Sequence, residues 1–144
     1  MLEKKIVIIV QARMGSTRLF GKVLKKLGES TLLEILIERL KRNRITDEIV
    51  IATTTNPIDD PIVELAKKLG VDYYRGSEDD VLDRFYNAAK ENQAEIIVRV
   101  TGDNPLTDIE ILETITLTLI KGNYDYVAPR NVILGCLLYT SDAA

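Results

Sequence analysis

Apolar and polar residues alternate along the chain in blocks that predict strands followed by helices. Four short runs rich in β-branched or aromatic residues are typical of buried parallel strands, and they span residues 5–10, 48–53, 72–75 and 95–101. Elsewhere, apolar residues recur every three or four positions, as on a helix with one buried face. The predicted helices span residues 31–43, 61–69, 79–91 and 107–121, and a fifth strand is predicted to begin at 125–128.

Local signals mark the ends of several helices. Thr31 with Glu34, and Thr107 with Glu110, have the spacing of a capping box, and Gly70 ends the second helix. The repeated strand–helix order predicts an α/β fold with a mainly parallel sheet, helices on both faces and right-handed crossovers. Ligands of such sheets bind beyond the carboxyl ends of the strands, at the point where the strand order reverses. The loops at that edge are predicted at 11–22, 53–60, 75–79 and 101–108.

Composition narrows the class of protein further. The 144 residues suit one domain or part of one, and 46% hydrophobic residues are enough to form a core. No apolar run approaches the ~18 residues of a membrane span, so no membrane contact is expected. Cys136 is the single cysteine, which excludes an internal disulfide and fits a reducing compartment. The chain has no histidine, which excludes Ser-His-Asp and Cys-His catalysis and histidine-bearing zinc sites.

The net charge of −3 hides two regions of opposite sign. Residues 1–44 hold eleven Lys and Arg against four Asp and Glu, whereas residues 45–144 hold eight against eighteen. A small basic region on an acidic body suits a compact anionic ligand such as a nucleotide, with acidic groups nearby to hold a cation. A nucleic-acid partner is not expected, because it would need a broad basic face. A solvated basic helix over 34–44 is the alternative source of part of the excess.

The loop at 11–22 follows the first strand directly and is rich in groups that bind phosphate. Glycines let the backbone approach a phosphate, hydroxyls donate to its oxygens, and Arg and Lys neutralise its charge. The residues of these types are Arg13, Gly15, Ser16, Thr17, Arg18, Gly21 and Lys22. They predict a triphosphate site, with solvated arginines as the alternative. The loop is no Walker A motif, because five residues separate Gly15 from Gly21 and Val23 follows Lys22.

A second candidate follows the fourth predicted strand, where the chain reads Gly102-Asp103-Asn104-Pro105. A carboxylate at a strand's carboxyl end is well placed for Mg²⁺, which prefers oxygen ligands and is often held by one or two carboxylates plus substrate phosphates. The alternative is an aspartate that caps a turn. If the first and fourth predicted strands are neighbours, Asp103 should face the loop at 11–22.

Four segments of the chain resemble the cytidylyltransferase family, which includes CMP-sialic acid and CMP-Kdo synthetases. They read QARMGSTRLFGKVL, EIVIATTTNPIDD, RGSEDDVLDRFYNAA and IIVRVTGDNPLTD, and the similarity runs from about residue 5 to 130. The spore-coat polysaccharide biosynthesis branch is the most similar. The resemblance implies a Rossmann-like nucleotide-diphospho-sugar transferase fold with three α/β/α layers. The residues that match the family's first-loop pattern are Arg13, Ser16, Arg18, Gly21 and Lys22.

The resemblance also implies a reaction, in which CTP and a sugar acid give a CMP-sugar and pyrophosphate. It implies a cytoplasmic role in surface polysaccharide synthesis, and homodimers among full-length relatives. Arg13, Lys22 and Asp103 would be catalytic, and Asp103 would bind Mg²⁺. The implied nucleotide-binding residues are Ala12, Arg13, Gly15, Ser16, Arg18, Lys22, Thr53, Asp80, Arg84 and Gly102.

Part of this set has alternative interpretations. Asp80 and Arg84 lie where family members contact base and ribose, but their spacing also fits a surface ion pair on a helix. Thr53 and Thr54 have two interpretations as well. Their hydroxyls would contact the base or the ribose, or they simply end the second strand. The alternatives for the whole function are a sugar-1-phosphate nucleotidyltransferase with another base and a non-catalytic nucleotide-binding module. A dehydrogenase ranks below them, because the Gly-x-Gly-x-x-Gly fingerprint is missing.

The chain departs from the family at two places. Phe20 stands where the family pattern has proline, which predicts a more flexible loop. Family members continue past residue 144 with a sugar pocket, a dimerisation arm and a second metal-binding carboxylate. We therefore expect 1–130 to be the nucleotide-binding part of a truncated domain that binds nucleotide without turnover. Residues 131–144 are predicted to be a tail foreign to the family.

Overall fold

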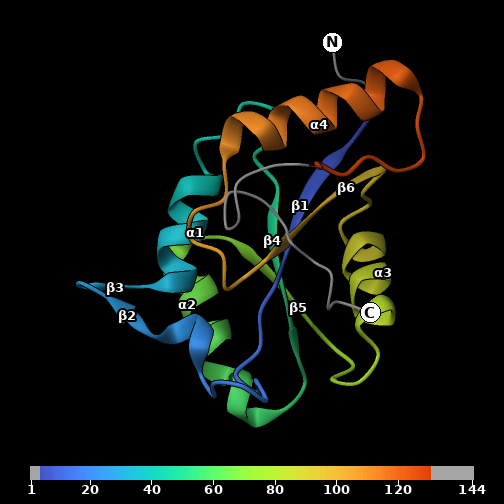
Figure 1. The fold of residues 1–144 in the computed structure, drawn as a ribbon. Coiled ribbons are helices and arrows are strands. Elements are labelled where there is room, and N and C mark those ends of the chain that lie inside the picture. Colours follow the sequence, from blue (N-terminus) through green and yellow to red (C-terminus); the bar gives the residue numbers. More distant parts are fainter. Residues whose placement is uncertain (1–3, 131–144) are drawn as a thin grey trace.

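The computed structural model describes residues 4–130, which form a parallel sheet between helices (Figure 1). The sheet has four strands in the order β5-β4-β1-β6. Their bounds are β1 Ile6–Gln11, β4 Ile49–Thr54, β5 Asp72–Gly76 and β6 Ile96–Thr101. The α-helices are α1 Leu32–Leu40, α2 Asp60–Leu69, α3 Val81–Glu91 and α4 Ile109–Gly122. The predicted tail at 131–144 lies outside the described residues.

Four shorter elements were not predicted from the sequence. They are the 3₁₀ helices η1 Lys22–Leu24 and η2 Pro57–Asp59, and the antiparallel pair β2 Lys26–Leu27 and β3 Ser30–Thr31. Each of them spans only two or three residues, which is too short for a hydrophobic period to show.

The strand order reverses between β1 and β6. From β1 the chain adds β4 and then β5 on one side, and it then crosses back to place β6 on the other side of β1. All of these pairings are parallel, and Gln11 is in register with both Ala52 and Thr101. The carboxyl ends of β1, β4 and β6 therefore meet at one edge, where open α/β sheets bind ligands.

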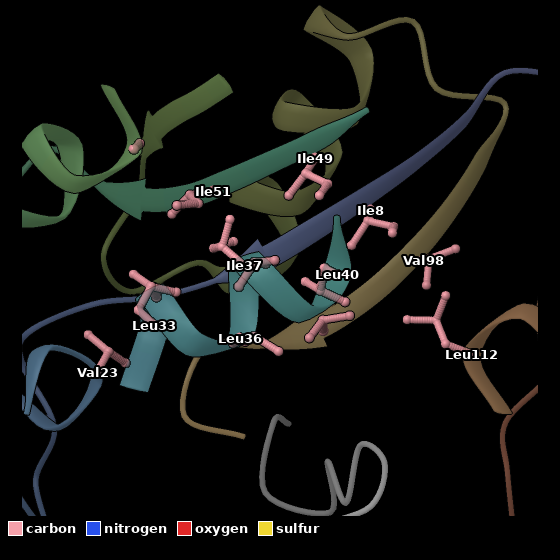
Figure 2. Packing of buried hydrophobic residues seen from close by; sticks show 14 of the residues in the cluster. Ile8, Val23, Leu33, Leu36, Ile37, Leu40, Ile49, Ile51, Val98 and Leu112 are labelled. Atoms are coloured by element: carbon pink, nitrogen blue, oxygen red, sulfur yellow. The ribbon is translucent and has the colours of Figure 1, made fainter. Parts of the chain in front are cut away.

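Helices cover both faces of the sheet, as the apolar pattern predicts. Even-numbered positions of β1, such as Ile8, share a core with α1, α2 and α4. Figure 2 shows Leu40 of α1 beside Ile8, and Leu112 of α4 beside Val98. On the opposite face, the odd-numbered positions pack against α3. The three-layer α/β/α fold is therefore confirmed.

The face covered by α3 is incomplete at β6. Phe85 of α3 packs against the β1 and β4 side chains of that face, and the guanidinium of Arg99 lies 5.0 Å from the centre of its ring. Ile97 of β6 remains 46% exposed.

Within residues 4–130, no helix is long and apolar enough to cross a membrane.

One predicted capping box is confirmed and the other is wrong. Thr31 accepts a hydrogen bond from the Glu34 N–H, and Glu34 accepts one from the Thr31 N–H, so both halves of that box form. At α4 the cap is Asp108, whose carboxylate accepts from the Ile111 N–H. Thr107 is buried and its hydroxyl donates to the Asn104 carbonyl, which closes the preceding turn instead of capping the helix.

The predicted fifth strand at 125–128 is also wrong. This segment has no strand structure, and it lies across a cavity from β6 and α4. A strand needs a partner for its backbone hydrogen bonds, and no strand ladder joins this segment to the sheet.

A buried carboxylate on α4 binds the segment that follows α1, and it predicts that the stability of the fold depends on pH. Glu113 accepts from the Arg44 backbone N–H at 2.7 Å and from Arg44 Nη2 at 2.8 Å. The side-chain hydrogen bond from Arg44 is the main cause that lowers the pKa of Glu113 below its ordinary value of 4.5. The pKa of Glu113 is lower in the folded chain than in the unfolded chain, so the ionised carboxylate stabilises the fold. This contribution to the free energy of unfolding is fully present above pH 4.5 and is lost as the pH falls through the folded pKa.

Glu113→Gln is therefore expected to lower the Tm at pH 7 and to flatten its decline under acid. Circular dichroism melts between about pH 7 and pH 3 measure both effects, since this range spans ordinary carboxyl pKa values. Glu64→Gln is the matched control, because Glu64 pairs with Lys67 on the exposed face of α2 and such pairs contribute little. Equal acid profiles for the parent and Glu113→Gln would contradict the prediction.

Candidate functional site

The loops after β1 and β6 meet because of a glycine. The Gly102 N–H donates to the Gln11 carbonyl at 2.7 Å, directly after the last pair of the β1–β6 ladder. A Cβ at this position would lie 2.7 Å from that carbonyl oxygen and 3.0 Å from the Ala12 Cβ. Only glycine permits this approach. The predicted nucleotide-binding residue Gly102 thus has a structural role, and its N–H is already engaged.

The close approach brings a lysine and a carboxylate together across the strand reversal. Lys22 Nζ lies 2.9 Å from Asp103 Oδ2, although the two residues are 81 positions apart. Both side chains are about two-fifths exposed, at 42% and 43%, so a ligand can reach them. The prediction that Asp103 faces the first loop is confirmed.

The first loop folds back on one peptide group. The Met14 carbonyl accepts hydrogen bonds from the N–H groups of Ser16 at 2.9 Å and Gly21 at 2.8 Å. Gly21 has a φ of 69°, which favours glycine, and η1 begins at the next residue, Lys22. The Ser16 hydroxyl accepts from the Leu19 N–H at 3.3 Å. Residues 14–21 therefore form a closed turn that presents Lys22.

The other predicted residues of this loop lie at different depths. Ala12 is buried and donates its N–H to the Ala52 carbonyl, so it joins the loop to β4. Arg13 and Gly15 are half-buried, and Arg18 is exposed. A Cβ on Gly15 would make only ordinary contacts, 3.5 Å from Glu78 Oε1 and 3.8 Å from Ile58 Cδ1. Of the loop's three cations, the structure thus places Lys22 beside Asp103 at the end of β6.

Arg84 lies in the interior, so the interpretation of Asp80 and Arg84 as a surface ion pair is wrong. Arg84 is fully buried, and its Nη1 donates to the carbonyls of Ser77 at 2.5 Å and Glu78 at 3.5 Å. Asp80 is exposed and caps α3 by accepting from the Asp83 N–H. Arg84 is one helical turn from Val81 and from Ala88, so its spacing already marked the buried face.

The charge of Arg84 interacts with the first loop. Burial is the main cause that lowers the pKa of Arg84, and Arg13 lowers it further, whereas Asp59 and Glu78 raise it. Arg13 and Arg84 are therefore close enough for their like charges to interact. Within residues 4–130, Arg84 Nε and Nη2 have no hydrogen-bond partner.

The two threonines that end β4 differ in their partners. Both are buried, so the structure places neither hydroxyl at the surface, and contact with a nucleotide stays a prediction for Thr53. The Thr53 hydroxyl has no partner among the described residues. The Thr54 hydroxyl donates to Asp59 and accepts from the Asn56 N–H at 3.1 Å.

Asp59 is a functional candidate that sequence reasoning missed. Its carboxylate is 1% exposed, and it accepts from the Met14 N–H at 2.7 Å. In the sequence it stands only as an acidic residue just before a helix, a pattern typical of a cap. No local signal distinguishes a carboxylate that caps its own helix from one that reaches another loop.

The protein groups around Asp103 could bind a metal ion only together with a bound phosphate compound. The described residues contain no group of three or more acidic, cysteine or histidine side chains that could hold an ion. Asp103 is an accessible carboxylate that pairs with Lys22. Mg²⁺ accepts such a position when substrate phosphates supply other oxygens. The residues therefore fit Mg²⁺ that arrives with a phosphate ligand, and they do not form a resident metal site.

The parallel sheet and the reversal of its strand order, with Lys22 and Asp103 paired where β1 and β6 end, define an open α/β protein of the doubly wound class. The cytidylyltransferase family model matches residues 7–139, and the chain belongs to this family. The match extends past Arg130 into the predicted tail, and the exact domain boundary stays a prediction.

Three curated relatives illustrate the similarity. An uncharacterized protein of Methanocaldococcus jannaschii is 54% identical, with 96% of this chain and 58% of the relative covered. The spore coat polysaccharide biosynthesis protein SpsF of Bacillus subtilis is 41% identical, with 90% and 56% covered. The 3-deoxy-manno-octulosonate cytidylyltransferase of Solibacter usitatus is 32% identical, with 83% and 46% covered. The chain thus spans about half the length of the curated relatives it matches.

A solved structure gives the same result for the fold. The cytidylyltransferase from Leptospira borgpetersenii is 44% identical and superposes with a TM-score of 0.80. The superposition covers 83% of this chain and 50% of that chain. Both the family and the fold expected from the resemblance are therefore confirmed.

Proposed function

We propose that this chain is the nucleotide-binding part of an enzyme that transfers a cytidylyl group from CTP to a sugar acid. Surface polysaccharide or glycan synthesis in the cytoplasm would be its setting, and a homodimer its assembled form. The observation that carries the proposal is the position of Lys22 beside Asp103 at the strand reversal. Family membership supports the use of CTP, and the name of the Solibacter relative supports a sugar acid.

The chemistry needs positioning and charge more than an acid or a base. A hydroxyl oxygen of the sugar would attack the α-phosphorus as the bond to the β-phosphate oxygen breaks. Pyrophosphate leaves with that electron pair, and the hydroxyl proton passes to solvent. Arg13, Arg18 and Lys22 would bind the phosphates that leave, which are the most negative part of the nucleotide. The absence of histidine from the chain is therefore no obstacle to this reaction.

The Lys22–Asp103 pair suits an exchange of partners when the nucleotide binds. In the structure each group neutralises the other at 2.9 Å. A triphosphate would take Lys22 as its counter-charge, and Asp103 would then hold Mg²⁺. When bound, Mg²⁺ neutralises negative charge on the phosphates. Exposed ion pairs are weak, so opening this one costs little.

Calorimetric titration of the chain with CTP, with and without Mg²⁺, tests the proposal. We expect binding that strengthens with Mg²⁺ and that favours CTP over UTP and GTP. In Asp103→Asn the effect of Mg²⁺ on affinity should disappear, while binding of CTP without metal remains. Equal affinity for all three nucleotides would instead favour a sugar-1-phosphate nucleotidyltransferase with another base.

Turnover is tested separately, because the chain spans about half of its relatives. Pyrophosphate release from CTP and 3-deoxy-manno-octulosonate should be followed in a chain extended to the length of the relatives. Nucleotide binding without product in the extended chain would favour a non-catalytic nucleotide-binding module.

A further inference from the structure

We propose that Asp59 is a positioning residue for the first loop, residues 11–22. Its buried carboxylate holds the Met14 peptide, on which the rest of that loop closes. This inference rests on the proposed function in one respect, that the loop binds nucleotide phosphates. The hydrogen bonds themselves are independent of any ligand.

Asp59 occupies the N-cap position of α2 but does not cap it. An aspartate at this position ordinarily accepts from an N–H in the first turn of its own helix. The Asp59 side chain makes no such bond. Its Oδ1 accepts instead from the Met14 N–H at 2.7 Å, and its Oδ2 accepts from the Thr54 hydroxyl. The carboxylate thus serves a loop 45 residues away in the sequence.

Met14 passes this constraint to the rest of the loop. Its N–H donates to Asp59, while its carbonyl accepts from both Ser16 and Gly21. Its side chain packs against the main core and comes within 3.3 Å of a Cβ built on Gly21. A shift of the Met14 peptide would therefore move both ends of the turn, and Lys22 follows directly.

The Asp59 carboxylate belongs to a chain of hydrogen bonds that starts on β4. The Asn56 N–H donates to the Thr54 hydroxyl, which donates to Asp59, which accepts from Met14. A carboxylate that is 1% exposed needs compensation for its lost hydration. These two donors supply it, together with the nearby charge of Arg84. The network thus fixes the first loop relative to the end of β4.

Two neighbouring threonines provide a matched pair for the test. Thr53 and Thr54 are both fully buried on β4, but only the Thr54 hydroxyl has a partner. Thr54→Val removes the donor to Asp59 Oδ2 and leaves the carboxylate in place. Thr53→Val removes a hydroxyl that bonds nothing in residues 4–130. The two variants are the same chemical change at adjacent positions.

The experiment compares Asp59→Ala, Asp59→Asn, Thr54→Val and Thr53→Val with the parent by two measurements. The first is the Kd for CTP with Mg²⁺. Asp59→Ala should weaken it by about tenfold, as expected for a lost hydrogen bond to a charged group. Asp59→Asn should recover part of the affinity, because its amide oxygen can still accept from Met14. Thr54→Val should weaken binding less than Asp59→Ala. Thr53 is itself a predicted nucleotide contact, so Thr53→Val is compared by the second measurement alone.

The second measurement is amide hydrogen exchange, which needs no nucleotide. A positioning role predicts faster exchange confined to Met14, Ser16 and Gly21. A purely stabilising role predicts that core amides such as Val7 and Ile51 accelerate equally. Exchange at Met14 that is unchanged, or that rises only with the core, would overturn the proposal.

Each other outcome also decides the question. If Asp59→Ala does not fold, amide exchange at Met14 in Thr54→Val against Thr53→Val decides, and equal exchange in these two variants overturns the proposal. If the parent does not bind CTP, the proposed function fails, and the exchange data still decide the role of Asp59.

Discussion

Replacing Lys22 with methionine is expected to weaken binding of Mg·CTP by about tenfold to a hundredfold, the range for hydrogen bonds to charged groups. Methionine keeps an apolar stem of similar length and removes the ammonium, so the loop backbone keeps its packing. Among residues 4–130, Lys22 forms the ion pair with Asp103. Its charge therefore acts where the triphosphate and Asp103 would meet. The Tm should hardly change, because the pair is about two-fifths exposed.

Lys121→Met is the matched control for this prediction. Lys121 is an exposed residue in the last turn of α4, and the two variants lose the same charge. Calorimetry at one fixed salt concentration compares them with the parent. If Lys22→Met binds like the parent, the assigned pocket is wrong. If Lys121→Met loses as much affinity, the effect is a general one of net charge and not of the site.

Gly102→Ala is expected to destabilise the fold and to separate the two halves of the site. The added Cβ would lie 2.7 Å from the Gln11 carbonyl oxygen, closer than real Cβ contacts come. Both Gln11 and Ala12 contribute backbone to the crowded region, so no flexible side-chain end can move aside. The ends of β1 and β6 must therefore part. Overpacking of this kind costs roughly 1–3 kcal/mol.

The same variant should also weaken CTP binding, because Asp103 follows Gly102 and would move away from Lys22. Thermal melts and calorimetry measure the two effects on one sample. Gly15→Ala is the control for stability, since its Cβ would meet only ordinary contacts at 3.5 Å and 3.8 Å. It should melt with the parent, so a loss of CTP affinity there would report backbone approach to the phosphates. A Gly102→Ala variant that melts with the parent would contradict the prediction.

Parts of the candidate site that lie within one segment could be predicted from the sequence. Parts that depend on contacts between distant segments were missed. The cationic loop at 11–22 could be recognised as a candidate because its cations, glycines and hydroxyls stand within twelve residues and directly follow a strand. The burial of Arg84 was visible in principle, since it shares helical spacing with Val81 and Ala88. Asp59 was not, because a cap and a long-range acceptor look identical in sequence.

Two errors in the predicted elements have related causes. The Thr107–Glu110 spacing fits a capping box, but burial of Thr107 directs its hydroxyl to the Asn104 carbonyl, and Asp108 becomes the cap. The segment at 125–128 has the composition of a strand, yet it lies across a cavity from β6. In both cases a local preference was overruled by the partners that the fold supplied.

By itself the sequence determined the order of strands and helices, the two apolar faces of the sheet and the loop that carries the cations. These features follow from hydrophobic periods and from residue types within a few positions of one another. Only the tertiary structure decided that Lys22 contacts Asp103, 81 positions away, and that Asp59 holds Met14 instead of capping α2. Such contacts depend on which strands become neighbours and in what register, and a local pattern cannot encode that.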